Sequence, residues 1–227
     1  MLITGTSRGI GNYLAKHYLE LGYTVFGCSR SEVKINSKNY LHTSCNISDS
    51  KSVKSMLTKI RKDYGGLDIL INNAGIASMN HSLLTKSDTV NKIFKTNFLG
   101  TFLLSRESAK LMQLNKFGRI VNFTTVAVPL NLEGEAIYAS SKAAVCSLTK
   151  ILAKEFGGFN ITVNAIGPTP IKTDLIKSIP SNKIDSIINQ QAIRRYGTFE
   201  DTSNVIDFFI SSRSDFITGQ ILYLGGL

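Results

Sequence analysis

Thr4-Gly5-Thr6-Ser7-Arg8-Gly9-Ile10-Gly11 lies at the start of the chain, directly after the apolar residues Met1-Leu2-Ile3. Its glycines permit a tight turn and let a bound pyrophosphate approach the backbone closely. A helical pattern begins at Ile10, so the free N–H groups and the positive dipole end of that helix would face the same phosphate. Strand, glycine loop and helix in this order are the context that such a motif requires. The stretch therefore predicts a nucleotide-binding turn, and an ordinary glycine-rich turn is the alternative.

The rest of the chain alternates short apolar segments with longer amphipathic ones. We expect strands over residues 2–4, 23–28, 40–44, 67–72, 119–123, 161–165 and 220–224. We expect helices over residues 10–21, 50–64, 87–114, 137–156 and 200–211, with irregular or short-helical structure over 168–198. This alternation predicts an α/β fold: one doubly wound Rossmann domain over 1–227, with a parallel seven-stranded sheet and helices on both faces. In such sheets ligands bind beyond the carboxyl ends of the strands.

Length and composition agree with one domain. The 227 residues are 43% hydrophobic and 19% charged, which suffices for a core. No stretch has the roughly 18 uncharged apolar residues that a membrane helix requires. The start of the chain has no basic region followed by a long apolar segment, so we expect no signal peptide. A cytoplasmic protein without membrane contact is the expectation.

Metal and nucleic-acid binding are disfavoured. Cys28, Cys45 and Cys146 are widely spaced and form no CxxC pair, and the three histidines do not cluster, so we expect no metal site and no disulfide. The net charge of +10 invites a nucleic-acid interpretation, but the basic residues are scattered, with no dense or aromatic-interleaved run. We expect no nucleic-acid partner.

The end of the second expected strand bears on the choice of nucleotide. Enzymes that use NAD usually carry Asp or Glu there, to hold the ribose 2′-hydroxyl. This strand ends Gly27-Cys28-Ser29-Arg30, without an acid. Arg30, joined by Arg8 of the glycine loop, can instead bind a 2′-phosphate through charge-assisted hydrogen bonds. The pattern favours NADP(H), and two solvated surface arginines are the alternative.

Tyr138 and Lys142 are four residues apart in an expected helix and so lie on one face of it. Reduction of a carbonyl needs a hydride on carbon and a proton on oxygen. Tyrosine is a poor acid/base at neutral pH because its pKa is about 10. A nearby ammonium group stabilises tyrosinate, so we expect Lys142 to lower the pKa of Tyr138 and allow general acid/base catalysis. Such pairs are common on surfaces, and this one alone is a weak signal.

Together these features resemble the short-chain dehydrogenase/reductase family, and the resemblance covers nearly the whole chain. The matching segments are the Thr4–Gly11 loop, Asn72-Asn73-Ala74-Gly75, Asn97, Gly118 to Asn122, Tyr138 with Lys142, Val163 to Pro168, Ile217 to Gln220, and Gly225-Gly226. So many matches in order are specific for the family and much less so for the substrate.

The resemblance implies roles for individual residues. Tyr138 would be the proton donor in reduction, Lys142 would assist it and hold the nicotinamide ribose, and Asn97 would hold a water in a proton relay. The cofactor-binding residues implied by the resemblance or by the patterns above are Gly5, Ser7, Arg8, Gly9, Ile10, Gly11, Ser29, Arg30, Asn46, Ile47, Asn73, Ala74, Gly75, Tyr138, Lys142, Pro168, Ile171 and Thr173. The alternatives are that Asn97 only kinks or caps a helix and that residues 73–75 form a tight turn without ligand contact.

Two positions depart from the family pattern. The hydroxyl that orients the substrate is normally a serine thirteen residues before the tyrosine, and here that position is Thr125. Threonine can make the same hydrogen bond, although Thr124 next to it is an alternative. Asn46 stands where an aspartate often contacts the adenine amino group, and its carbonyl oxygen can still accept that bond with help from the Ile47 backbone.

The resemblance implies an NADP(H)-dependent oxidoreductase acting on a small carbonyl or secondary alcohol. Residues at about 168–198 would form a substrate lid. Family members similar to 3-oxoacyl-carrier-protein reductases suggest a carrier-bound 3-oxoacyl thioester, which a basic surface would attract. The alternatives are a sugar, steroid or other alcohol substrate, or a silent NADP(H)-sensing or scaffold protein. The family also implies a homodimer or homotetramer formed through the helices at 87–114 and 137–156.

Overall fold

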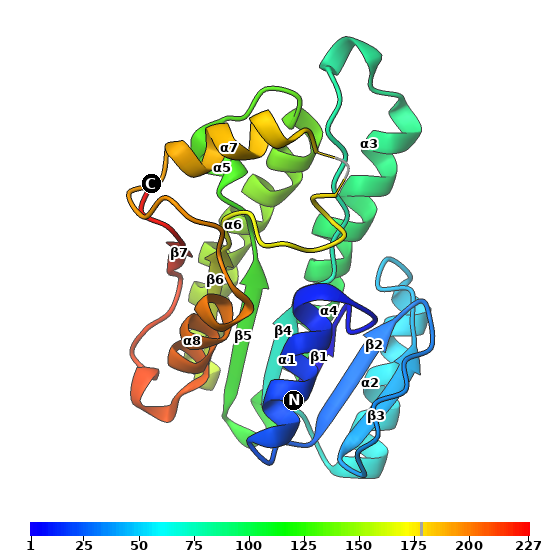
Figure 1. The fold of residues 1–227 in the computed structure, drawn as a ribbon. Coiled ribbons are helices and arrows are strands. Elements are labelled where there is room, and N and C mark those ends of the chain that lie inside the picture. Colours follow the sequence, from blue (N-terminus) through cyan, green and yellow to red (C-terminus); the bar gives the residue numbers. More distant parts are fainter. Residues whose placement is uncertain (178) are drawn as a thin grey trace.

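Seven parallel strands form one sheet, in the order β3-β2-β1-β4-β5-β6-β7 (Figure 1). The computed structural model describes residues 1–177 and 179–227. The strands are β1 (Leu2–Thr4), β2 (Val25–Ser29), β3 (Tyr40–Ser44), β4 (Ile69–Asn72), β5 (Gly118–Phe123), β6 (Ile161–Gly167) and β7 (Ile221–Tyr223). The strand order reverses between β1 and β4, which sets the ligand crevice at the carboxyl ends of these strands. The predicted fold class is confirmed.

Helices cover both faces of the sheet, and each face has its own apolar core. On one face, α1 (Gly9–Glu20) and α8 (Phe199–Ile210) bury Leu14, Tyr18 and Ile206 against the strands. On the other face lie α2 (Ser50–Tyr64), α4 (Gly100–Asn115) and α6 (Ala136–Phe156). Burial on both faces explains why β1, β2, β4, β5 and β6 are buried at every position rather than at alternate positions.

The long helix expected over residues 87–114 is interrupted. It consists of α3 (Ser87–Phe94), one π-helical turn (Lys95–Leu99) and α4. A π turn inserts an extra residue into the helical ladder and is frequent at functional sites. Here it directs Asn97 into the interior, where the side chain is fully buried.

Short elements complete the chain. Two helices that the sequence did not resolve are α5 (Ala127–Leu130) and α7 (Ser181–Asn189), and α7 lies within the expected lid. Short 3-10 turns occupy Ser82–Leu84, Gly157–Phe159 and Ser212–Ser214. Within the described ranges, no helix is both long and apolar enough to cross a membrane.

Candidate active site

The glycine loop joins β1 to α1 and leaves the start of α1 open. Gly5 and Gly9 adopt positive φ angles of 74° and 56°, which glycine tolerates best. A Cβ on Gly11 would lie 2.3 Å from the Gly5 carbonyl oxygen, so only glycine fits there. No side chain caps α1, and its first N–H groups are therefore available to an anion. This cradle fits the pyrophosphate of a dinucleotide.

An elongated cleft runs from this loop past the ends of β2 and β3. The predicted cofactor residues that line it are Gly5, Ser7, Arg8, Gly9, Ile10, Ser29, Arg30, Asn46, Ile47, Asn73, Ala74, Gly75 and Thr173. Gly11 lies behind the loop and does not line it. The structure thus brings together at one cleft residues that span most of the sequence.

Charges in the cleft are mixed. Arg8 is exposed and lies 3.7 Å from Asp174, measured between Nη1 and Oδ2. Arg30 is also exposed and lines the cleft beside the end of β2. Glu32, three residues beyond the end of β2, is an exposed acid that also lines this cleft and was not among the predicted site residues. Two cations, Arg8 and Arg30, and two carboxylates, Glu32 and Asp174, therefore line the cleft in which a 2′-phosphate is expected.

Asn73 and its neighbours fasten β4 to β1. The Asn73 side-chain amide donates to the Thr4 carbonyl oxygen at 2.8 Å, and the Ala74 N–H donates to Thr4 Oγ1 at 2.9 Å.

Asn46 uses its Oδ1 to accept the Ser48 N–H, and the side chain of Ile47 is buried in the core. A ligand could therefore still use the second lone pair of Asn46 Oδ1 and the backbone of Ile47.

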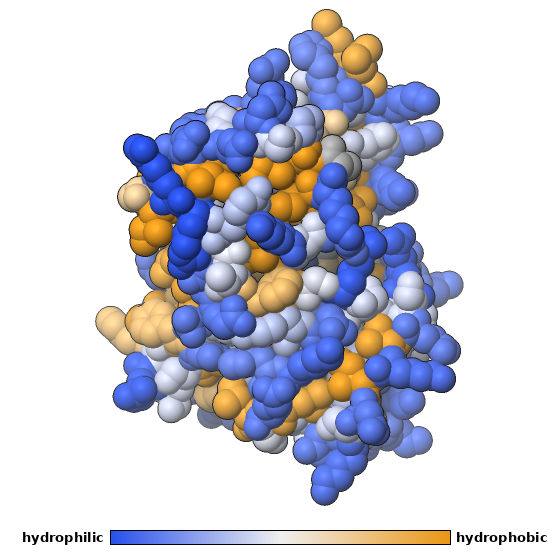
Figure 2. All heavy atoms as spheres, in the orientation of Figure 1, coloured by the Kyte–Doolittle hydropathy of each residue, from blue (hydrophilic) through white to orange (hydrophobic). Residues whose placement is uncertain are grey.

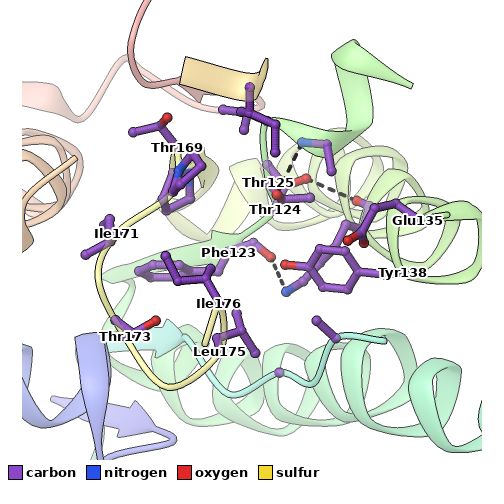
Figure 3. Close-up of a pocket in the computed structure, with 18 of the residues that line it drawn as sticks. Phe123, Thr124, Thr125, Glu135, Tyr138, Thr169, Ile171, Thr173, Leu175 and Ile176 are labelled. Carbon is purple, nitrogen blue, oxygen red and sulfur yellow. Dashed lines mark hydrogen bonds between the residues drawn. The ribbon is translucent and has the colours of Figure 1, made fainter. Parts of the chain in front are cut away.

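A second pocket adjoins the first at Ile10, Asn73 and Gly75. Thr125, Tyr138, Lys142, Pro168, Ile171 and Thr173 line it, so most of the predicted catalytic and nicotinamide-side residues meet here (Figure 3). The Lys142 ammonium donates to the Phe123 carbonyl oxygen at 2.7 Å. Tyr138 and Lys142 come from α6, and Thr125 follows the end of β5.

Burial dominates the acid–base properties of this pocket. It raises the pKa of Tyr138 to about 12; a hydrogen bond with Thr125 opposes this rise, and the negative charge of Glu135 adds to it. Burial also lowers the pKa of Lys142 to about 8. The expected lowering of the Tyr138 pKa by Lys142 is not found in the protein alone, where burial is the largest influence on that pKa.

The two threonines have different surroundings. Thr124 is buried, and its hydroxyl contacts the Lys142 carbonyl oxygen at 3.3 Å and Cys146 Sγ at 3.1 Å. Thr125 is half-buried, accepts the Ala127 N–H at 3.3 Å and interacts with Tyr138. Thr125 is thus the threonine whose hydroxyl shares the pocket with Tyr138.

Asn97 fastens the π turn to two other segments. Its side chain accepts the Ile76 N–H and donates to the Ile76 carbonyl oxygen, both at 2.9 Å, and also donates to Ser141 Oγ at 3.0 Å. Its backbone carbonyl oxygen accepts a hydrogen bond from Thr101 Oγ1 at 2.7 Å. The residue does not line either pocket. These contacts hold the segment after β4 against α6, and the relay role stays a prediction.

The segment after β6 closes the pocket from the other side. The Pro168 carbonyl oxygen accepts the Val126 N–H at 3.3 Å, and Ile171 is buried beside Gly197. Thr173 packs near Gly9 and lines both pockets. Apolar side chains of this segment, including Leu175 and Ile176, face Tyr138 across the pocket (Figure 3).

Glu135 is a pocket residue that the sequence analysis missed. It is 4% exposed, lines the pocket and precedes Tyr138 by three residues, one helical turn. Burial raises the pKa of its carboxyl group to about 7, while the charge of Lys183 acts in the opposite direction. The spacing from Tyr138 was the only available signal, since the burial depends on the fold.

Comparisons with known proteins agree with this geometry. The profile of a family described as Enoyl-(Acyl carrier protein) reductase matches residues 5–226. The chain belongs to the short-chain dehydrogenase/reductase family. Its relatives include the 3-oxoacyl-[acyl-carrier-protein] reductase FabG of Salmonella typhimurium and that of Escherichia coli, each 33% identical over 99% of this chain and 95% of the relative. The predicted family and the predicted enzyme class, an oxidoreductase, are confirmed.

Solved short-chain dehydrogenase/reductase structures superpose closely on this one. ElxO with NADP bound has a TM-score of 0.90 and 35% identity, with 98% of this chain and 95% of that chain covered. A 4-hydroxyisoleucine dehydrogenase complexed with NADH has a TM-score of 0.91 and 32% identity, with 99% and 96% covered. Since these neighbours hold different nicotinamide cofactors, the choice in this chain depends on its own cleft residues.

Proposed function

We propose that the protein uses NADPH to reduce the keto group of a 3-oxoacyl thioester. The observation that carries the proposal is that Tyr138, Lys142 and Thr125 meet in one pocket that adjoins the cleft of the glycine loop. NADPH supplies a hydride for the carbonyl carbon. The rest of the chemistry belongs to residues of the chain.

Each residue has a defined task in this proposal. Thr125 and Tyr138 hold the carbonyl oxygen by hydrogen bonds, and the Tyr138 hydroxyl gives its proton to that oxygen. A tyrosine with a pKa near 12 is fully protonated at neutral pH, which suits the reductive direction. The Lys142 ammonium lies in the same pocket and stabilises the tyrosinate left behind. Arg8 and Arg30 hold the 2′-phosphate.

Two observations support a thioester substrate. The pocket beyond Tyr138 is mainly apolar, with Leu132, Ile176 and Ile187 among its lining residues, which suits an acyl chain. The net charge of +10 suits an acidic carrier. The named activity of the FabG relatives points the same way. The likeness to a 4-hydroxyisoleucine dehydrogenase favours a second candidate, oxidation of a secondary alcohol of an amino acid or reduction of the corresponding ketone.

The test is NADPH oxidation with acetoacetyl thioesters, a hydroxy amino acid and a panel of other carbonyls. We expect turnover of the thioester, and Tyr138→Phe should lower kcat by at least about a hundredfold, since general acid catalysis contributes about 10²–10⁴. Absence of any reduction by a protein that still binds NADPH tightly would favour the sensor alternative.

Cofactor choice has its own test. We expect tighter binding of NADPH than of NADH, and Arg30→Ala should weaken NADPH alone by about ten- to a hundredfold, the usual worth of a hydrogen bond to a charged group. Equal affinities of the parent protein for both cofactors would overturn the assignment to NADP(H). Arg213→Ala, an exposed arginine that lines neither pocket, is the matched control.

We further infer that 1–227 acts as one domain and that residues 168–198 serve as a substrate lid. Ile171, Leu175, Ile176 and Ile187 line the pocket, so this segment excludes water from it when in place. Shortening of the α7 helix should raise KM for the substrate more than that for NADPH.

We also propose a homodimer or homotetramer that packs through α4 and α6. Ile151 on α6 is 51% exposed and Leu114 on α4 is 58% exposed. A monomeric species on a sizing column at all concentrations would contradict this proposal.

A further inference from the structure

Glu135 is a buried carboxyl group that the reaction proposed above leaves unused. It stands at the N-terminus of α6, yet its side chain does not cap the helix. Its Oε2 atom is buried and has no hydrogen-bond partner among the described residues. An unpaired buried polar atom is costly, so a group that regularly enters the pocket is its expected partner.

The described residues around Glu135 offer few polar or charged partners for its carboxyl group. Of the titratable groups on the elements packed against it, Tyr138 lies one turn along α6, and Lys183 on α7 acts on it through its charge. Lys183 forms no ion pair with it in the described part of the chain. Neighbouring lining residues such as Leu132 and Ile187 are apolar. Among the described residues, Oε2 thus has no protein partner, and Glu135 lines the pocket that a substrate would enter.

Figure 3 shows the Glu135 carboxyl on the same side of the pocket as Thr125 and the Tyr138 hydroxyl. A carbonyl oxygen bonded to Thr125 and Tyr138 would thus bring adjacent atoms of the substrate within reach of Glu135. Burial raises the pKa of Glu135 to about 7, against the positive charge of Lys183, so ionised and protonated forms coexist at neutral pH. The ionised carboxylate accepts hydrogen bonds only.

We propose that Glu135 selects substrates by accepting a hydrogen bond from an N–H group close to the reacting carbonyl. The inference rests on the proposed reductase activity, because it concerns the same pocket, and it goes beyond the thioester named above. A 3-oxoacyl amide carries such an N–H group, whereas a thioester has sulfur in that place. The negative charge also raises the pKa of Tyr138, so a substrate bound in this way meets a tyrosine that holds its proton. Glu135 is a specificity residue in this proposal and takes no part in proton transfer.

The test compares methyl acetoacetate with N-methylacetoacetamide, which differ by an oxygen in place of an N–H. The readout is the ratio of kcat/KM for the amide to that for the ester, in the parent and in Glu135→Leu. Intrinsic reactivity cancels when the two ratios are divided. We expect Glu135→Leu to lower the ratio by about ten- to a hundredfold, the worth of one hydrogen bond to a charged acceptor.

Two further variants sharpen the result. Glu135→Gln keeps a carbonyl acceptor without the charge and should lower the ratio less than the leucine variant does, and it serves alone if the leucine variant fails to fold. Glu133→Gln, an exposed neighbour outside the pocket, should leave the ratio unchanged.

The outcomes separate this proposal from the proposed function. If the parent reduces both probes and the Glu135 variants leave the ratio unchanged, the proposal fails while the function stands. A ratio that rises in Glu135→Leu would also overturn it, since a protonated Glu135 would then be excluding N–H groups. If no carbonyl is reduced, the proposed function fails. The role of Glu135 is then decided by calorimetry, as the ratio of amide affinity to ester affinity in the NADPH-bound parent and variants.

Discussion

Replacing Lys142 by methionine should make the cofactor-free protein more stable while it removes activity. Lys142 is 4% exposed, and burial lowers the pKa of its ammonium group from 10.5 to about 8. Such a shift corresponds to about 3 kcal/mol of destabilisation of the folded state at neutral pH. Loss of the hydrogen bond from Lys142 Nζ to the Phe123 carbonyl oxygen would cost about 1 kcal/mol of stability and so offset part of the gain. Methionine has similar length and no charge, so we expect a net gain of about 2 kcal/mol in the free energy of unfolding.

The pH dependence of the stability difference between Lys142→Met and the parent gives a sharper test. The folded protein loses the Lys142 proton near pH 8, while the unfolded chain keeps it to about pH 10.5. The unfolded state therefore binds more protons in this window, and parent stability rises with pH there through Lys142. The advantage of Lys142→Met should be complete below about pH 8 and should shrink toward pH 10.5.

Urea denaturation of parent and variant, without cofactor, near neutral pH and near pH 10 measures the difference. Lys150→Met, an exposed position on the same helix, is the control and should change stability by less than about 0.5 kcal/mol. If Lys142→Met is less stable than the parent near pH 7, or if the difference does not change with pH, burial does not disfavour the charged form as argued.

Three further changes test other parts of the site. Gly11→Ala places a Cβ against the Gly5 carbonyl oxygen and should cost about 3 kcal/mol or more by urea denaturation and weaken NADPH binding, and a variant of parental stability would contradict this contact. Thr125→Val should lower kcat/KM by about a hundredfold, with Thr125→Ser active, whereas Thr124→Val should have a much smaller effect; the reverse pattern would assign the substrate to Thr124. Thr198→Ala removes the capping box of α8 and should lower the free energy of unfolding by about 1 kcal/mol, and no loss in urea denaturation would count against that role.

The sequence predicts those parts of the site that depend on local spacing. The glycine loop lies between a strand and a helix, and Tyr138 and Lys142 share one helical face, so both features can be recognised without a structure. The sheet follows from the alternation of elements along the chain.

What the sequence could not supply depends on contacts between distant segments. The π turn that buries Asn97 has no simple signature, because the apolar pattern continues through it. The pKa of Tyr138 is raised mainly by burial, which depends on how distant segments close the pocket. Glu135 reads as an ordinary polar residue before a helix until the fold closes an apolar pocket around it.

The contact between Arg8 and Asp174 has a consequence for the order of binding. Arg8 belongs to the glycine loop and Asp174 to the segment after β6, and both side chains are largely exposed, so the pair is weak. A cofactor phosphate that draws Arg8 to itself would leave Asp174 paired with Lys177 alone, while Thr173 stays against Gly9. Binding of the nucleotide in its cleft would thereby alter the entrance of the substrate pocket. We expect an ordered kinetic mechanism in which the nucleotide binds first and leaves last. The oxidised nucleotide should then inhibit competitively against the reduced one.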